Sequence, residues 1–148
     1  MGSPPGPDAA GSGRRALRKA VFFAVALPAV VRAAWRVSRS YRRLALDRQV
    51  EHLRDVPPFR LAWMRRSPHW LAGCVERLLP VLPPHGHGSC LKRCLHLLDL
   101  WARCDLEPEL RLGLQGEAAF REGHAWVVSR RQPAIRTAAL EYEEAFRF

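Results

Sequence analysis

The chain has 148 residues, of which 48% are hydrophobic and 26% are charged. That balance is typical of a single globular domain and excludes a wholly disordered, collagen-like or disulfide-dense chain. The formal net charge is +10, and the whole excess lies in the first half: residues 1–70 hold 14 basic and 4 acidic side chains, whereas residues 71–148 hold 10 of each. A uniformly cationic nucleic-acid-binding module is therefore disfavoured, and a basic arm joined to a neutral domain fits better.

The first segment is expected to be a flexible tail followed by a helix. Residues 1–13 hold nothing that can form a core, and a helical pattern begins at Arg14. Residues 20–31 are an uncharged apolar run of 12 residues flanked by Lys19 and Arg32. A bilayer-spanning helix takes about 20 residues, and the arginines that follow the run at once are unlike the mature start of an exported protein. We expect a helix that lies on a membrane or docks on a partner.

Residues 14–60 are interpreted as a basic helical arm. Pro28 should kink or break its helix, because proline removes a backbone hydrogen bond. Beyond Pro28, arginines recur at helical spacing and form a basic stripe of Arg32, Arg36, Arg39 and Arg43. Such a stripe is either a solvated helix face or a contact surface for anionic lipid or an acidic peptide.

Residues 61–148 are predicted to form an α+β domain, in which helices come first and a small antiparallel sheet follows. Apolar residues keep helical spacing over residues 67–79 and 89–101, and a serine stands at the start of each segment, as in N-caps. After Pro108 the spacing changes to the period of two that is typical of strands. The predicted strands are residues 110–114, residues 124–129 and a short third strand at residues 134–138.

The four cysteines are too few for a disulfide scaffold in a chain of this length. We interpret Cys74, Cys90, Cys94 and Cys104 as reduced thiols of a cytosolic protein. Cys90 stands in the first turn of a predicted helix, where free backbone N–H groups favour a thiolate. His124 begins the second predicted strand, from which it could return to that helix start and act as a base. The alternative is a structural thiol and an unrelated surface histidine.

Three stretches resemble a known family, in the right order and spacing. Residues 88–95 (GSCLKRCL) resemble the C-L-x-R-x-L helix start of the transglutaminase-like proteins that process lasso-peptide precursors. Residues 108–114 (PELRLGL) and 123–127 (GHAWV) are similar to that family's p-x-L-r-i-G-v and a-H-A-W-v strands, and the helix end at residues 77–80 is also similar. The resemblance is close over residues 65–130, whereas the basic arm is similar to that family only in its general character.

The resemblance implies a fold, an activity and partners. The fold would be a reduced papain/transglutaminase-like α+β domain, spanning residues 61–148. The activity would be that of a cysteine peptidase that removes the leader from a ribosomally made precursor peptide, with Cys90 as the nucleophile and His124 as the base. The implied partners are the precursor, a separate leader-recognition protein and an ATP-dependent lasso cyclase. Neither a cofactor nor a nucleic acid is expected, and the location would be the cytoplasm, with peripheral attachment to the inner membrane face through the basic arm.

The third catalytic residue is where the chain departs from the family pattern. That pattern places an acidic or amide residue about a dozen positions after the histidine, but no Asp or Asn follows His124 here. The orienting group is Glu141, a backbone carbonyl, or missing. Loss of this group lowers the rate about 10⁴-fold in serine proteases, so an inactive or weakly active scaffold or binding protein is the alternative function.

Two further features of the sequence bear on the candidate site. His85, His87, Cys90 and Cys94 have the side chains of a zinc site but not the spacing of the familiar structural patterns, so no metal is expected. Trp126 stands two residues after His124 and shares its face of a strand, where it either shields a thiolate–imidazolium pair from water or packs in the core.

Overall fold

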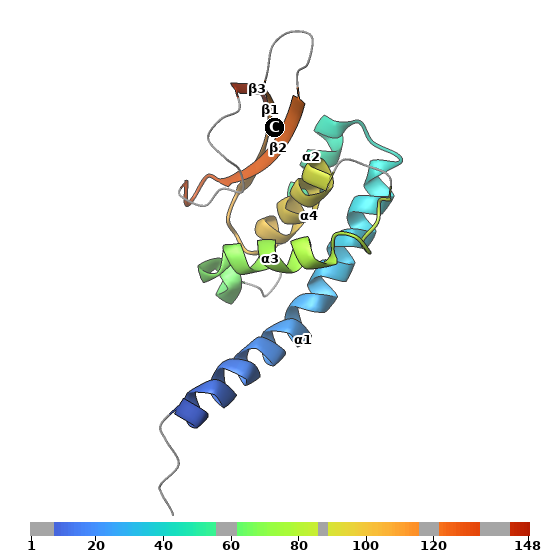
Figure 1. Cartoon of the computed structure of the whole chain (residues 1–148). Helices are drawn as coiled ribbons and strands as arrows, with labels where there is room; N and C mark the ends of the chain where they lie inside the picture. The colour runs from blue at the N-terminus through green and yellow to red at the C-terminus, as the bar shows by residue number, and fades with distance from the viewer. Residues whose placement is uncertain (1–7, 56–61, 86–88, 116–121, 134–142) are drawn as a thin grey trace, which may run out of the picture.

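The computed structural model describes residues 8–55, 62–85, 89–115, 122–133 and 143–148 (Figure 1). Its elements are, in chain order, α1 (Asp8–Tyr41), α2 (Leu46–Arg54), the short 3-10 helix η1 (Ala62–Arg66), α3 (Pro68–Leu78), α4 (Ser89–Arg103), β1 (Pro108–Gln115), β2 (Glu122–Ser129) and β3 (Glu143–Arg147). The strands form an antiparallel sheet. The predicted α+β order, with helices first and a small antiparallel sheet after them, is confirmed.

The first strand in sequence lies in the middle of the sheet, whose order is β2-β1-β3. β1 pairs with β2 from Pro108 opposite Ser129 to Gln115 opposite Glu122. Residues that face each other in an antiparallel pair point to the same side. Leu110 and Leu112 therefore share a face with their partners on β2, and that face packs against α4.

The hydrophobic core joins the first two helices to the rest of the molecule. The buried face of α1 repeats at steps of three and four residues, as expected of an amphipathic helix. It contributes Ala26, Val30, Ala33 and Val37 to the core, and α2 contributes Val50 and Leu53. The same cluster holds Leu98 and Trp101 of α4 and Leu110 of β1. The core thus continues across the boundary expected at residue 60.

An ion cluster ties α1 and α2 to α4. The fully buried carboxylate of Asp99 accepts a hydrogen bond from Arg103 at 2.8 Å and pairs with Arg36 at 3.1 Å. The Arg36 guanidinium also donates to the carbonyl of His52, near the end of α2, at 2.8 Å. Burial lowers the pKa of Arg36, and the Asp99 carboxylate opposes that shift. Arg36 is therefore part of the interior and not of an exposed basic stripe.

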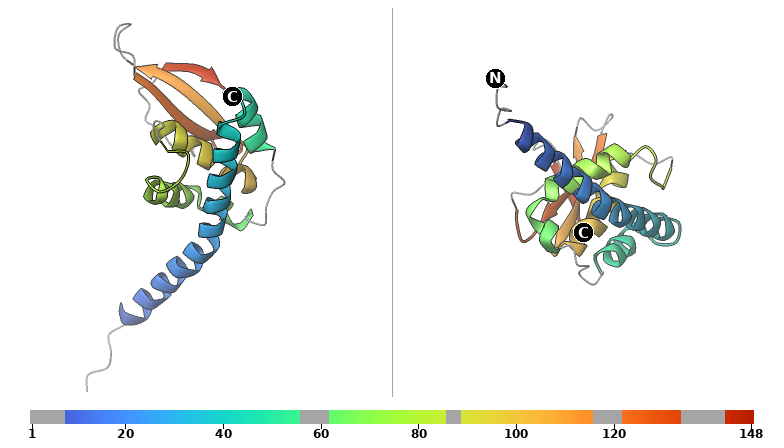
Figure 2. Two further views of the ribbon diagram at one scale, coloured as in Figure 1. Left: turned by 90° about the vertical axis from the view of Figure 1, so that its right-hand side faces the viewer. Right: turned by 90° about the horizontal axis from the view of Figure 1, so that it is seen from below.

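The helices and strands differ locally from the sequence prediction. α1 begins at Asp8, inside the expected tail, and runs through Pro28 without a break, so of the kink or break expected there the break does not occur. Pro28 is exposed, so water can reach the carbonyl that it leaves unpaired, and the helix bends partway along its length (Figure 2). α2 and β3 were not predicted from the sequence, and the third strand expected at residues 134–138 lies outside the described residues.

Candidate functional site

α4 presents Cys90 in its first turn, since the helix begins at Ser89. The amide N–H groups of a first turn have no partners within the helix, and together with the helix dipole they favour a negative charge. The Cys90 side chain is partly exposed and packs at the edge of the core. The predicted nucleophile thus lies where the backbone can stabilise an anion.

Cys90 and His124 border the same pocket, which has a volume of about 210 Å³ and lies between the start of α4 and the sheet. Its other walls are apolar and come from all three strands: Leu112, Gly113 and Leu114 of β1, Gly123 and Ala125 of β2, and Ala145 and Phe146 of β3. The structure therefore brings the predicted nucleophile and the predicted base to one site from distant parts of the chain.

The strand alternation decides which way the His124 side chain points. Ala125 and Val127 belong to the core that packs on α4, so His124 and Trp126 point to the other face of β2. The His124 and Trp126 rings are stacked there, with centroids 6.5 Å apart and planes at 23°. The expected sharing of one face by His124 and Trp126 is confirmed. The thiol and the imidazole thus approach the pocket from different sides of β2.

The third catalytic residue stays a prediction, because Glu141 lies outside the described residues. Two carboxylates of the sheet are described, and both pair with arginines. Glu144 of β3 pairs with Arg111 at 2.9 Å, and the nearly buried Glu109 of β1 accepts a hydrogen bond from Arg130 at 2.8 Å. Burial opposes ionisation of Glu109, but the Arg130 hydrogen bond and the neighbouring arginines lower its pKa overall. These carboxylates therefore hold the sheet together.

Of the four cysteines, Cys90 alone is partly exposed. Burial raises the pKa of the Cys74 thiol and raises that of Cys104 to about 12. Cys94 is also buried, one turn after Cys90 on α4. A reagent or a substrate that enters from the surface therefore meets only the Cys90 thiol.

The four residues with the side chains of a zinc site, His85, His87, Cys90 and Cys94, are only partly described. His87 lies outside the described residues, and Cys94 points into the core. Within the described ranges, no group of three or more His, Cys, Asp or Glu side chains is arranged to hold a metal ion.

A larger pocket, of about 700 Å³, lies along the exposed side of α1 and is called the α1 groove below. Its apolar walls include Leu27, Val31 and Trp35 of α1 together with Val81, Leu82 and Pro83, which follow α3. Arg39, Arg42 and Arg43 line its other end. The sequence placed Val31 and Trp35 beside the basic stripe, but the contribution of the segment after α3 depends on tertiary packing and carried no local signal.

Comparison with known proteins gives no relative: no family model, no curated protein and no solved structure matches this chain. No helix in the described part of the chain is long and apolar enough to cross a membrane.

Proposed function

We propose that the protein is a transglutaminase-like cysteine peptidase that removes the leader from a lasso-peptide precursor. The observation that carries the proposal is the meeting of Cys90, at the start of α4, with His124, on β2, at one pocket. A nucleophilic cysteine at a helix start and a histidine on a neighbouring strand are the two parts that this chemistry needs. The helix, strand and strand order of the family motifs also agrees with the order of α4, β1 and β2.

The proposed reaction has two steps. The Cys90 sulfur attacks the carbonyl carbon at the end of the leader, the C–N bond breaks, and His124 passes the thiol proton to the leaving amine of the core peptide. Water then attacks the thioester, the C–S bond breaks to release the leader with a free carboxyl end, and His124 takes the proton of the water and returns one to the sulfur. In this proposal the backbone N–H of Cys90 donates to the oxyanion in both steps. A leader-recognition protein would present the precursor, and an ATP-dependent cyclase would close the ring.

Cleavage of the precursor tests the proposal directly. Purified full-length protein, precursor and recognition protein should together yield the free leader. Cys90→Ala should lower the rate at least about 10³-fold, since the nucleophile is lost. Cys74→Ala is the matched control, because it removes a buried thiol of α3 and should leave the rate unchanged. Cleavage by Cys90→Ala at the wild-type rate would falsify the peptidase assignment.

A second candidate function is a binding protein of the same fold without turnover. The strand register favours it, because the His124 and Trp126 side chains point away from the face that packs on α4. The reactivity of Cys90 toward a thiol reagent separates the two candidates. A peptidase should show fast alkylation that slows in His124→Ala, whereas a binding protein should show the rate of an ordinary free thiol, unchanged in His124→Ala.

A further inference from the structure

α1 extends far beyond the body of the molecule. Its C-terminal half packs on the core, whereas its N-terminal half projects away from the other helices and the sheet (Figure 1 and the left view of Figure 2). The α1 groove lies on the exposed side of the packed half, next to the segment that follows α3. The projecting half and the groove belong to the same helix, so they can meet the same partner.

The exposed side of the packed half is apolar. Leu27, Val31 and Trp35 follow each other at steps of four residues and keep exposed fractions of 45, 55 and 60%. Val81, on the segment after α3, is 71% exposed and lines the same groove. Apolar side chains gathered from two elements differ from the single exposed apolar residues that are normal on any surface, and such patches mark interaction sites.

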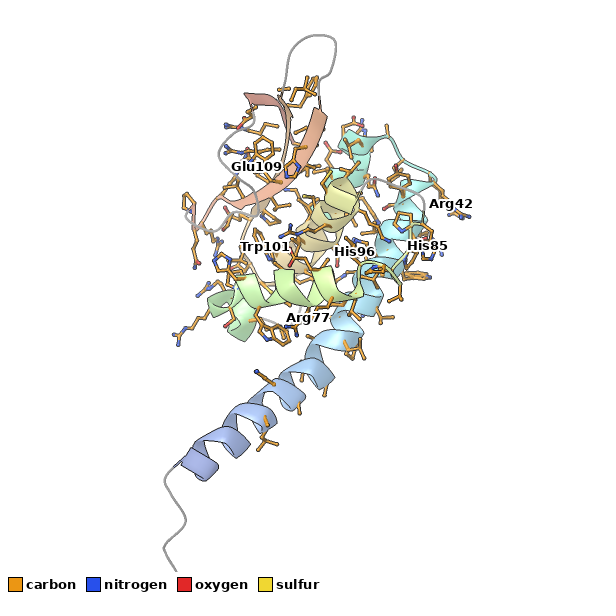
Figure 3. The ribbon with its side chains drawn as sticks, in the orientation of Figure 1. Arg42, Arg77, His85, His96, Trp101 and Glu109 are labelled. Carbon is orange, nitrogen blue, oxygen red and sulfur yellow. The ribbon has the colours of Figure 1, made fainter. Side chains whose placement is uncertain are left out.

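The same region carries only positive charge. The sequence has no Asp or Glu between Asp8 and Asp47, but it has nine arginines and lysines in that interval. Arg39, Arg42 and Arg43 stand at the end of the groove, and Arg42 points outward there (Figure 3). The Arg39 guanidinium lies over the Trp35 ring, 5.4 Å from its centroid. The apolar surface is thus bordered by cations placed to bind anions.

These features together identify the occupant. A second copy of the chain would bring a second set of cations to a region that has no Asp or Glu between residues 8 and 47, which is unfavourable. A helix that combines an apolar face, an exposed tryptophan and flanking cations is typical of helices that lie in the headgroup region of a membrane. We propose that the exposed side of α1 and the segment after α3 dock on the surface of an anionic phospholipid bilayer. This proposal does not depend on the peptidase assignment.

In the docked state, Leu27, Val31, Trp35 and Val81 would enter the boundary between headgroups and acyl chains, and Arg42 and Arg43 would contact lipid phosphates. The uncharged run of residues 20–31 suits this arrangement, because it is too short to cross the bilayer and long enough to lie in its interface. The pocket that holds Cys90 is lined by the strands and the start of α4, and none of its residues lines the α1 groove.

Vesicle co-sedimentation of the full-length protein tests the proposal. The protein should pellet with vesicles of equal parts phosphatidylcholine and phosphatidylglycerol, much less with phosphatidylcholine alone, and less as salt is raised. Arg42→Gln together with Arg43→Gln should weaken binding about 30-fold, because each cation near an anionic surface is worth about a factor of five. Val31→Glu should weaken binding at least about tenfold, because it removes an apolar contact and adds a repelled charge.

Matched controls test whether binding depends on this particular surface or only on the total charge and apolar content of the protein. The double variant Arg48→Gln, Arg66→Gln removes the same charge from exposed positions outside the groove, and Phe146→Glu makes the same kind of change at an exposed apolar residue of β3, outside the groove. Both should bind as the wild type does, and all variants should keep the wild-type thermal midpoint.

Three outcomes would overturn the proposal. Wild-type protein that does not pellet with anionic vesicles has no membrane-docking surface. Binding that weakens equally in the groove variants and in their controls reflects total charge and not this face. Self-association in the absence of vesicles that Val31→Glu abolishes would assign the face to a second copy of the chain.

Discussion

Cys90 is set apart from the other cysteines by its surroundings. Cys74, Cys94 and Cys104 lie inside the core, where burial makes ionisation of a thiol unfavourable, as the raised pKa values of Cys74 and Cys104 show. Cys90 combines partial exposure with a position in the first turn of a helix. The same residue type therefore serves packing at three positions and can serve chemistry at one.

This difference predicts the pattern of thiol labelling. In the folded protein at neutral pH, one thiol should react rapidly with a disulfide reagent such as Ellman's, because Cys90 alone among the four cysteines is accessible. All four should react after unfolding in urea. The fast phase should vanish in Cys90→Ala and persist in Cys74→Ala. A fast phase that survives in Cys90→Ala would show that another cysteine is accessible and that the site is wrongly placed.

Asp99 is the second residue whose role depends on its surroundings. Its carboxylate is fully buried, and it is the shared partner of Arg36 and Arg103. Asp99→Ala should lower the free energy of unfolding by about 3–5 kcal/mol, because two arginines would be left in the interior without their counter-ion. Urea unfolding followed by circular dichroism measures this loss. Glu51→Ala, which breaks the exposed pair with Arg48, is the control and should cost less than about 1 kcal/mol. Equal losses in the two variants would contradict the buried-cluster argument.

At the scale of elements, the sequence predicts local periodicity well and long-range contacts poorly. The alternating leucines predicted β1, the serine and proline at the start of α3 predicted that helix, and the motif positions placed Cys90 and His124 on elements that do share a pocket. Arg36 was assigned to an exposed stripe because its partner Asp99 lies on another helix, which spacing along α1 cannot show. β3 was missed for a similar reason, since its short segment gains its strand conformation by pairing with β1.

α4 also anchors the segment that connects it to α3. Lys92 donates from Nζ to the carbonyl of Leu79 at 2.8 Å, and the fully buried His96 donates from Nδ1 to the carbonyl of Lys92 at 2.6 Å. Burial lowers the pKa of His96 below its ordinary value of 6.5, so the folded chain protonates this ring at a lower pH than the unfolded chain does. The stability of the folded protein should therefore depend on pH through this buried histidine.

The direction of the pH dependence of stability follows from proton binding at His96. Below about pH 6.5 the unfolded chain binds a proton at His96 that the folded chain does not, so the free energy of unfolding should fall as pH decreases from there, by up to about 1.4 kcal/mol per pH unit. Well above about pH 6.5, His96 is neutral in both states, and its contribution to the free energy of unfolding is fully present. Urea unfolding between about pH 7 and about pH 5 measures the slope, which should be shallower in His96→Leu because the titrating group is gone. Equal slopes in the two proteins would rule out His96 as their source.

At the scale of the whole molecule, the positive charge has two roles. Part of it is structural, since Arg36 and Arg103 neutralise the buried carboxylate of Asp99. Another part faces outward around the α1 groove, at Arg39, Arg42 and Arg43. The neutral half carries the pocket with Cys90 and His124. The arginines that form one basic region in the sequence thus have two roles in the structure. Some stabilise the fold, and others form a surface through which the protein can dock.

The shared core predicts how the chain can be divided. A fragment of residues 61–148 should not unfold cooperatively, because it lacks the α1 and α2 core residues, including Val30, Val37 and Leu53. Removing one large buried side chain costs about 2–5 kcal/mol, and a domain is stable by only about 5–15 kcal/mol in total. A fragment of residues 24–148 keeps these core residues and should show a cooperative thermal transition near that of the full chain. Differential scanning calorimetry of both fragments is the measurement, and a cooperative transition in residues 61–148 alone would mean that α1 and α2 are dispensable for the fold.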